Sequence, residues 1–250
     1  MRLLAFHGGG EVIDEPGKGP ITYPYFFYVV EHPEGTVLFD SGGHPDLVDR
    51  PAERLGPEAD AAFDIAMVEG DDAVSQLARA GIAAADVAHV VQSHLHYDHA
   101  GGLELFPDAV AHVQRAELDV LAHPPADQVL FYCPADYEHR TRWHVLDGGH
   151  DLFGDGRVVM VPTPGHTVGH QSLLVRLDSG ATVILAADAA YQPEEFLERR
   201  PSSVFSDEAA MLASFEVLEA LRVEHDARLV FTHDLSWPTT LRVAPERWYD

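Results

Sequence analysis

The sequence contains almost no cysteine and almost no lysine. Cys133 is the only cysteine, and Lys18 is the only lysine, among 250 residues. A single thiol cannot form an internal disulfide, and it excludes metal sites built from several cysteine ligands. Because the sequence places no base beside it, we interpret Cys133 as an inert small residue and not as a nucleophile.

Positive charge of any kind is scarce. The chain has 16 Lys and Arg residues against 41 Asp and Glu residues, which gives a formal net charge of −25. An acidic surface repels phosphate backbones and anionic lipids, so neither nucleic acid nor a membrane is expected as a partner. Strongly anionic substrates are disfavoured as well, unless a bound metal supplies positive charge locally.

Long apolar runs are also missing. No segment approaches the roughly 18 apolar residues of a membrane span. The N-terminal stretch MRLLAFHGGGEV has no small-residue cleavage site for a signal peptide, so we expect a cytoplasmic protein. With 46% hydrophobic residues the composition is that of an ordinary globular protein, and we expect one domain over residues 1–250.

Predicted strands and helices alternate along most of the chain. Strands are predicted in 25–43 (a hairpin around HPEG), 87–92, 109–113, 157–163, 171–177, 181–188 and 228–232. Helices are predicted in 71–82, 115–122 and 206–221, the last with Ser206 as its N-cap. The stretches 44–70 and 129–143 fit neither period and are predicted to be loops or lids over a site.

Histidine or aspartate follows the carboxyl end of four of these strands. The segment SHLHYDHAGG (93–102) comes directly after strand 87–92, and His166, Asp188 and His233 follow three later strands. Sheets of α/β proteins bind their ligands outside the carboxyl ends of strands. The four strand ends therefore predict one shared site.

The crowding in SHLHYDHAGG indicates metal binding. In an extended turn His94 and His96 project to the same side, so both can reach one ion, whereas Asp98 and His99 can reach a second. Adding His166 to the first ion, His233 to the second and Asp188 between them gives a two-metal site; such sites hold a hydroxide that is nucleophilic near neutral pH. The alternative, that these are ordinary core or surface histidines, is weak because imidazoles this close are unfavourable without a metal.

In combination these motifs resemble those of the metallo-β-lactamase superfamily. HLHYDHAGG matches its H-x-H-x-D-H loop, TPGHTVGH its third-histidine loop and LAADAAY its bridging-aspartate segment. FTHD matches its last histidine, and LFDSG (38–42) matches an early strand end. The resemblance runs from about residue 20 to the end of the chain. It implies an α/β fold, an αββα four-layer sandwich with two mixed sheets face to face, helices outside and the metals at one edge.

Within that superfamily the chain is most similar to the N-acyl-homoserine lactone lactonases, which are quorum-quenching hydrolases. The similarity lies in SHLHYDHAGG, VQRAE (113–117), TPGHTVGHQSL and DAAYQPEEF (188–196). It implies hydrolysis of a lactone ring by a metal-bridging hydroxide. It also implies two divalent metal ions, with zinc as the default and cobalt, manganese or iron as alternatives. A homodimer is common in that family.

The resemblance implies a ligand set in agreement with the spacing argument. His94, His96 and His166 hold one metal, Asp98, His99 and His233 hold the other, and Asp188 bridges them. Tyr191, three residues after the bridging aspartate, is expected to donate a hydrogen bond to the developing oxyanion or to the substrate carbonyl. Asp98 is expected to pass a proton to the leaving alkoxide, with water as the open alternative.

Other residues have supporting roles in this scheme. Asp40 is expected to orient a ligand imidazole through its remaining N–H, although a plain strand-end carboxylate fits equally well. His170 is a candidate brace for the metal loop, with a satisfied core histidine as the favoured alternative. An acyl tail needs an apolar groove, for which the candidates are Tyr97, Phe26, Phe27, Phe131 and Tyr132. For Phe26 or Phe27 alone, packing in a strand core is favoured.

Several related hydrolases remain as alternatives. The pyridoxolactonases share much of the motif pattern, so 4-pyridoxolactone is an open substrate, and phosphotriesters fit as a side activity. Glyoxalase II, a thioester hydrolase, needs a basic helical extension, but only 17 residues follow His233. The bridging Asp188 disfavours a metallo-β-lactamase, and the net charge disfavours an RNA-processing nuclease. A purely metal-binding module is disfavoured because all seven ligands are present.

Overall fold

The computed structural model describes residues 1–139 and 142–250, and it contains two mixed β-sheets. The first has the order β4-β1-β2-β3-β5-β6-β7 and the second the order β12-β11-β10-β9-β8. The strands of the first sheet are β1 (Arg2–Glu15), β2 (Gly19–His32), β3 (Gly35–Phe39), β4 (Asp64–Ala66), β5 (Val87–Val91), β6 (Val110–Gln114) and β7 (Trp143–Leu146). Those of the second are β8 (His150–Asp151), β9 (Val158–Pro162), β10 (Gln171–Arg176), β11 (Thr182–Ala187) and β12 (Arg228–Phe231).

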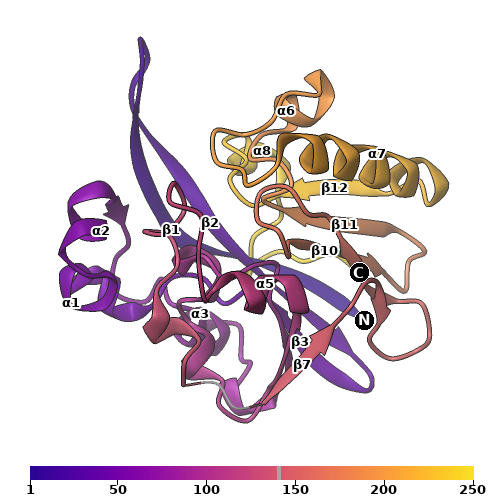
Figure 1. The fold of residues 1–250 in the computed structure, drawn as a ribbon. Coiled ribbons are helices and arrows are strands. Elements are labelled where there is room, and N and C mark those ends of the chain that lie inside the picture. Colours follow the sequence, from indigo (N-terminus) through magenta and orange to yellow (C-terminus); the bar gives the residue numbers. More distant parts are fainter. Residues whose placement is uncertain (140–141) are drawn as a thin grey trace.

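Three hydrophobic cores separate four layers. The core between the sheets combines Phe39 and Val91 of the first sheet with Leu173 and Leu185 of the second. A second core lies between the first sheet and α3 (Ala73–Arg79). A third lies between the second sheet and the helices α6 (Pro193–Glu198) and α7 (Glu208–Glu224). In Figure 1, α7 runs along the outer side of strands β10 to β12. This is the αββα arrangement that the sequence predicts.

The helices are short apart from α7. They are α1 (Pro51–Leu55), α2 (Pro57–Ala62), α3 (Ala73–Arg79), α4 (Tyr97–Ala100), α5 (Arg115–Val120), α6 (Pro193–Glu198), α7 (Glu208–Glu224) and α8 (Trp237–Thr240). The prediction of Ser206 as the cap of the last long helix is wrong. Asp207 is the cap, because its side chain accepts the amide hydrogen of Ala210, whereas the hydroxyl of Ser206 donates to Gln128.

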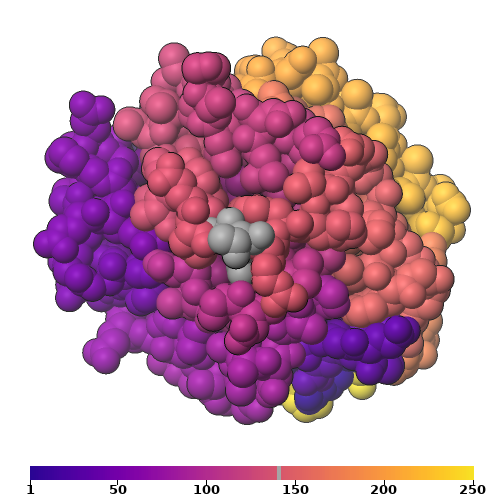
Figure 2. All heavy atoms as spheres, turned by 60° about the horizontal axis from the view of Figure 1, so that its bottom comes forward, coloured from indigo at the N-terminus to yellow at the C-terminus, as the bar shows by residue number. Residues whose placement is uncertain are grey.

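The hairpin of β1 and β2 extends beyond the body of the molecule (Figure 1, indigo). The sequence did not predict β1, because GGG (8–10) interrupts its alternation and the strand changes register between His7 and Gly10. Seen from the end away from the hairpin tip, the middle of the chain, in magenta to salmon, forms most of the face (Figure 2). The hairpin is therefore the element that projects away from the compact sandwich.

The prediction of loops or lids is wrong for 44–70, whereas the described residues of 129–142 are turns, coil and one short 3-10 helix. The stretch 44–70 contains α1, α2 and β4, and its Phe63 ring packs against Tyr97 and Phe131. This stretch therefore packs against Tyr97 and Phe131 through its own aromatic ring. In 129–143 the residues 140 and 141 lie outside the described residues. No helix in the described part of the chain has both the length and the apolarity that a bilayer crossing requires.

Candidate metal centre

The loop after β5 packs against the loop after β3. Gly101 and Gly102 allow this, because a Cβ on Gly102 would lie 2.4 Å from the carbonyl oxygen of Ser41. A Cβ on Gly101 would lie 2.5 Å from the amide nitrogen of His44. The Gly-Gly pair after the histidine cluster is thus required for the close approach of the two loop backbones. This approach fixes the position of the cluster.

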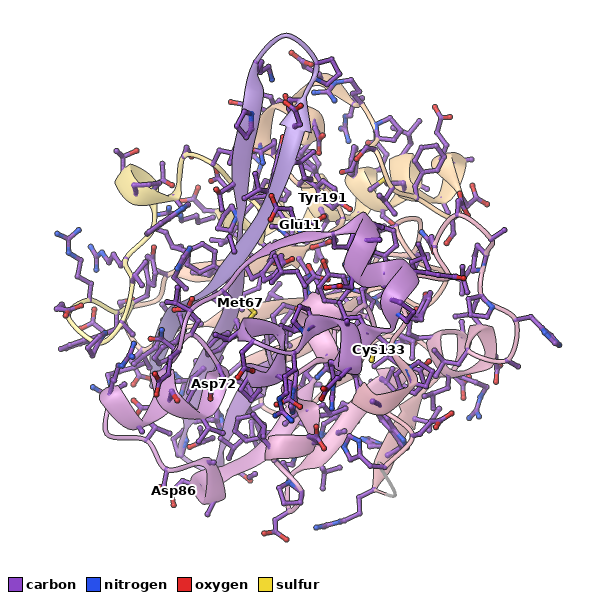
Figure 3. The ribbon with its side chains drawn as sticks, turned by 90° about the vertical axis from the view of Figure 1, so that its left-hand side faces the viewer. Glu11, Met67, Asp72, Asp86, Cys133 and Tyr191 are labelled. Carbon is purple, nitrogen blue, oxygen red and sulfur yellow. The ribbon has the colours of Figure 1, made fainter. Side chains whose placement is uncertain are left out.

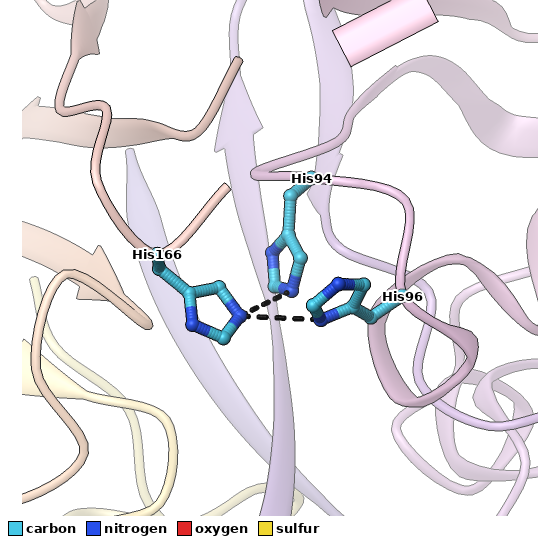
Figure 4. Close-up of side chains that lie close together, drawn as sticks. All are labelled: His94, His96 and His166. Carbon is cyan, nitrogen blue, oxygen red and sulfur yellow. Dashed lines mark hydrogen bonds between the residues drawn. The ribbon is translucent and has the colours of Figure 1, made fainter. Parts of the chain in front are cut away.

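Three histidines converge on one point (Figure 4). The Nε2 atom of His166 lies 3.2 Å from His94 Nε2 and 3.2 Å from His96 Nδ1. All three side chains are almost completely buried. Their ligand atoms lie within 4.8 Å of one another, a spacing that one metal ion can bridge.

A second group of ligand atoms lies beside the first. The Nε2 atom of His99 lies 3.3 Å from Asp98 Oδ2, and His233 Nε2 lies 3.6 Å from the same oxygen. Asp188 lies between the two groups: its Oδ2 is 3.2 Å from His233 Nε2 and 3.5 Å from His166 Nε2. The structure thus brings together all seven ligands that the sequence singles out, in the predicted groups.

Hydrogen bonds at the far side of the rings leave lone pairs pointing inward. The Nδ1–H group of His166 donates to the carbonyl of Val204, and that of His233 donates to the carbonyl of Pro24, both at 2.9 Å. His99 uses Nδ1 in the same way toward Asp40 Oδ2. A neutral imidazole that donates through Nδ1 has a free lone pair on Nε2, which is the form that binds metals.

The donor set therefore fits metal ions. Lone pairs at 3.2 Å repel each other unless a cation lies between them, and His99 Nε2 and Asp188 Oδ1 are buried without a hydrogen-bond partner among the described residues. Burial, together with the neighbouring imidazoles, holds the pKa of His94 and His96 well below the usual value, so both rings are neutral. Burial opposes a charge on His99 too, but Asp188, Asp98 and Asp40 raise its pKa well above the usual value. These carboxylates favour positive charge at the second group.

Asp188 is presented by a strained backbone. Ala187, at the end of β11, has φ 46°, and Asp40, just after β3, has φ 58°. Residues other than glycine avoid this left-handed region of backbone angles, and such strain concentrates at functional sites. Both strand ends turn in this way to direct a carboxylate at the histidines.

His170 braces the third-histidine loop. Its ring contacts Thr163 through Nδ1 at 2.9 Å, and its Nε2 accepts the amide hydrogen of Asp188 at 3.2 Å. His170 thus joins the loop that carries His166 to the backbone of Asp188, and it is at the same time a core histidine with both ring nitrogens hydrogen-bonded. Burial lowers its pKa to about 3, so the ring stays neutral and accepts this bond.

A cavity of about 440 Å³ opens onto both groups. His96, Asp98, Asp188 and His233 form part of its wall, and Tyr191 stands beside them with its ring centre 4.9 Å from that of His233. Burial and the nearby Asp188 raise the pKa of Tyr191 well above the usual value, so the phenol keeps its proton and can donate it in a hydrogen bond.

The aromatic residues predicted for a substrate groove divide into two sets. Tyr97 and Phe131 line the cavity. The groove assignment is wrong for Phe26 and Phe27, which lie in the cores on opposite faces of the first sheet, in agreement with the strand-core packing favoured for each. The prediction is also wrong for Tyr132, which does not line the cavity: it stands behind His96, with ring centres 4.8 Å apart, and donates to a buried carboxylate.

That carboxylate, Glu117, is a residue that the sequence reasoning missed. One of its oxygens accepts from Leu95 N and Tyr132 Oη, and the other accepts from Thr167 Oγ1 and Gly169 N. It joins the loop of His94 and His96 to the loop of His166. The motif VQRAE, one of the segments that carry the family resemblance, contains this residue, but its spacing gives no sign of the four donors that surround it.

Comparisons with known proteins find one family model and several relatives that match most of the chain. The model of the metallo-beta-lactamase superfamily matches residues 22–233. An N-acyl homoserine lactonase AttM of Rhizobium radiobacter is 32% identical over 228 residues, covering 89% of this chain and 86% of that protein. N-acyl homoserine lactonase AiiA of Bacillus thuringiensis subsp. kurstaki is 29% identical over 245 residues, covering 98% and 94%.

A solved structure is similar over nearly the whole chain. It is an N-acyl homoserine lactone hydrolase with the product N-hexanoyl-L-homoserine bound at its catalytic metal centre. The TM-score is 0.87 at 26% sequence identity, and the match covers 99% of this chain and 98% of the other. The predicted fold is therefore confirmed.

Proposed function

This chain belongs to the metallo-β-lactamase superfamily, and we propose that it is a metal-dependent lactonase that hydrolyses N-acyl homoserine lactones. One observation carries the proposal: a cavity with a partly apolar wall leads directly to the seven converging ligands. The similarity to AttM and AiiA proteins, both named N-acyl homoserine lactonases, supports the choice of substrate class.

The ligand sets define what the metals contribute. His94, His96 and His166 would hold one ion, Asp98, His99 and His233 the other, and Asp188 both. When bound, the metal pair supplies Lewis acidity toward a carbonyl oxygen and a hydroxide nucleophile near neutral pH. We propose zinc as the native metal, because imidazole and carboxylate are its usual ligands.

The residues of the chain act on the substrate oxygens. Hydroxide adds to the ring carbonyl carbon, and negative charge develops on the carbonyl oxygen. Tyr191, a protonated donor in the cavity wall, stabilises that charge with a hydrogen bond. The ring C–O bond then breaks, and the alkoxide takes up the proton of the O–H group that hydroxide brought to the carbonyl carbon, which leaves a carboxylate and an alcohol. Asp98 in the cavity wall is the proposed carrier of that proton.

The outer part of the cavity suits an acyl chain. Ile13, Pro16, Phe131, Pro201 and Val204 contribute apolar surface there. A chain attached to a ring at the metal ligands can extend outward along these residues. The substrate carries no net charge, so the acidic surface does not oppose its entry.

The test is a substrate panel with the zinc-reconstituted chain. Ring opening produces a carboxylic acid, which releases a proton near neutral pH, so turnover can be followed with a pH indicator in weak buffer. The panel contains acyl-homoserine lactones of increasing chain length, 4-pyridoxolactone, a thioester, a cephalosporin and paraoxon. We expect the acyl-homoserine lactones to have the highest kcat/KM. Turnover of 4-pyridoxolactone alone would keep the mechanism but change the substrate assignment to that lactone. No lactone turnover at all would refute the proposal.

Two further predictions depend on experiments of other kinds. The cytoplasmic location is tested by cell fractionation. The homodimer is tested by light scattering coupled to gel filtration, which gives the mass of the particle against the 27.4 kDa of one chain.

A further inference from the structure

Glu11 is a carboxylate in the cavity wall to which the reaction scheme assigns no role. It lies on β1 at the base of the projecting hairpin, and Figure 3 shows it next to Tyr191. Both residues line the cavity. Because β1 pairs with β2 on one side and β4 on the other, Glu11 is flanked by Tyr23 and Ile65 and its backbone is firmly placed.

Hydrogen bonds from behind orient the carboxylate. The phenol of Tyr97 donates to Glu11 Oε2 at 3.2 Å, and the hydroxyls of Tyr97 and Tyr25 lie 3.0 Å apart. Tyr25 and Tyr97 are each 1% exposed, so neither can swing away without opening the core. Oε1 has no hydrogen bond to another residue in the described part of the chain, which leaves it available to a ligand in the cavity.

The surroundings make this oxygen a strong acceptor. An ionised carboxylate accepts hydrogen bonds and donates none, and it gains most from a donor where water is scarce. Burial, followed by the charge of Asp98, raises the pKa of Glu11 to about 7. Cations held by the neighbouring ligands favour the ionised form. A substrate with an N–H group near Glu11 therefore donates a hydrogen bond to Oε1. A substrate without an N–H group leaves this oxygen without a donor and poorly solvated.

The position along β1 matches the order of groups in the proposed substrate. Glu11, Ile13 and Glu15 are alternate residues of one strand, so they share a face at spacings of about 6–7 Å, and all three line the cavity. Glu11 is the one beside Asp98 and His233, whose charges act on it. Ile13 comes next, and Glu15 is already bound to Lys18 and Tyr23. A lactone ring at the metal ligands thus places its amide near Glu11 and the start of its acyl chain near Ile13.

We propose that Glu11 determines substrate specificity by accepting a hydrogen bond from the amide N–H that joins the lactone ring to its acyl chain. This inference rests on the proposed function. It predicts that the enzyme distinguishes acylamino lactones from lactones of the same size that lack the N–H. Tyr25 and Tyr97 hold the acceptor in place.

The experiment compares two substrates that differ at one atom. N-hexanoyl-homoserine lactone carries the N–H, and α-hexanoyloxy-γ-butyrolactone has an oxygen in its place. A hydrogen bond to a charged group is worth enough to give the wild type a preference in kcat/KM of about 10- to 100-fold for the amide. Mass spectrometry of the products separates ring opening from cleavage of the second ester. Calorimetric affinities for the two ring-opened products give a readout that does not depend on turnover.

The variants are Glu11→Leu, which removes the acceptor, and Glu11→Gln, which keeps an acceptor oxygen without the charge. We expect the preference to fall to within about 3-fold of unity in Glu11→Leu and to an intermediate value in Glu11→Gln. The exposed Asp14→Asn, one charge removed from the same hairpin, is the matched control and should keep the full preference. A ratio of kcat/KM values within one variant does not depend on how much of the protein is active, so partial misfolding does not disturb the result.

Two different failures can be told apart. If the wild type opens the amide substrate but shows no preference for it over the ester substrate, Glu11 does not recognise the amide N–H. The same conclusion follows if Glu11→Leu loses activity equally on both substrates. If the wild type opens neither lactone while holding its metals, the proposed function is wrong, and this inference falls with it.

Discussion

The Oδ2 atom of Asp40 lies 2.9 Å from Nδ1 of His99, and both side chains are fully buried. The same carboxylate accepts from the amide and the hydroxyl of Ser93, the residue just before His94. Asp40 therefore orients the ring of one candidate ligand and anchors the start of the loop that carries three others. Asp40, which directly follows β3, thus sets the geometry of the loop after β5.

Removing that carboxylate should weaken one metal site more than the other. Without Asp40, the His99 ring is free to turn and to bear its proton on the ligand nitrogen. We expect Asp40→Ala to lower zinc affinity at the Asp98–His99–His233 group by about 10- to 100-fold. Titration of the metal-free chain against a competing chelator measures both affinities, with the exposed Asp49→Ala as control. Unchanged affinity at both sites would refute this role of Asp40.

Loss of the Tyr191 hydroxyl should slow the reaction and leave the metals in place. A hydrogen bond to an oxyanion contributes mainly in the transition state, so Tyr191→Phe is expected to lower kcat by about 100- to 1000-fold. The metal content and the unfolding midpoint should stay those of the wild type, because the ring still packs beside His233. Elemental analysis and steady-state kinetics test this together. A wild-type kcat would show that another group stabilises the charge.

Glu117 should stabilise the folded chain as well as hold the two ligand loops together. Its carboxylate accepts four hydrogen bonds from two loops and is 0% exposed. In Glu117→Ala these buried donors lose their partner, so we expect the free energy of unfolding to fall by about 3 kcal/mol or more. Urea denaturation of the metal-free protein measures this without any contribution from bound zinc. A loss below about 1 kcal/mol would mean that water replaces the carboxylate.

Stability should fall in mild acid because of a row of histidines between the sheets. His112 Nε2 lies 3.0 Å from His89 Nδ1, and His112 Nδ1 lies 2.9 Å from His144 Nδ1. Burial, followed by His89, His144 and His150, lowers the pKa of His112 to about 3. His112 in the unfolded chain therefore binds a proton near pH 6.5, whereas in the folded chain it stays neutral until about pH 3. Because the unfolded state binds more protons in this range, the free energy of unfolding decreases as the pH falls from about 6.5 toward 3.

The measurement is the free energy of unfolding of the metal-free chain at a series of pH values. The contribution of His112 is on the order of a few kcal/mol across that window. We expect His112→Gln to be less stable at pH 7, because hydrogen bonds are lost, but to show a shallower decline in acid. A variant that declines as steeply as the wild type would assign the acid sensitivity to other groups.

The ligands were predictable from the sequence because their spacing carries the information. His94, His96, Asp98 and His99 are close along the chain, and the other three follow strand ends, so a rule about parallel strands is enough to bring them together. Glu11 and Glu117 were not predictable in this way. Their partners are distant in sequence, such as Tyr97 for Glu11 and Thr167 for Glu117.

The errors have a common physical cause. Phe26 and Phe27 look available for a groove, yet the first sheet is covered on both faces, so neighbouring residues of β2 are both buried in cores. The choice between Ser206 and Asp207 as a cap depends on where α7 begins, and helix ends are set by local contacts such as the bond from Ser206 to Gln128. Patterning predicts which elements form, and tertiary contacts decide which residue of a pair faces the site.

The metal content of the purified chain decides whether the seven side chains hold two metal ions. After reconstitution with zinc and removal of the excess, elemental analysis should find about two zinc ions per chain. His233→Ala, which removes one ligand from the second group, should retain about one. A wild-type chain that holds no metal after reconstitution would contradict the account, because the seven converging side chains would then have another purpose.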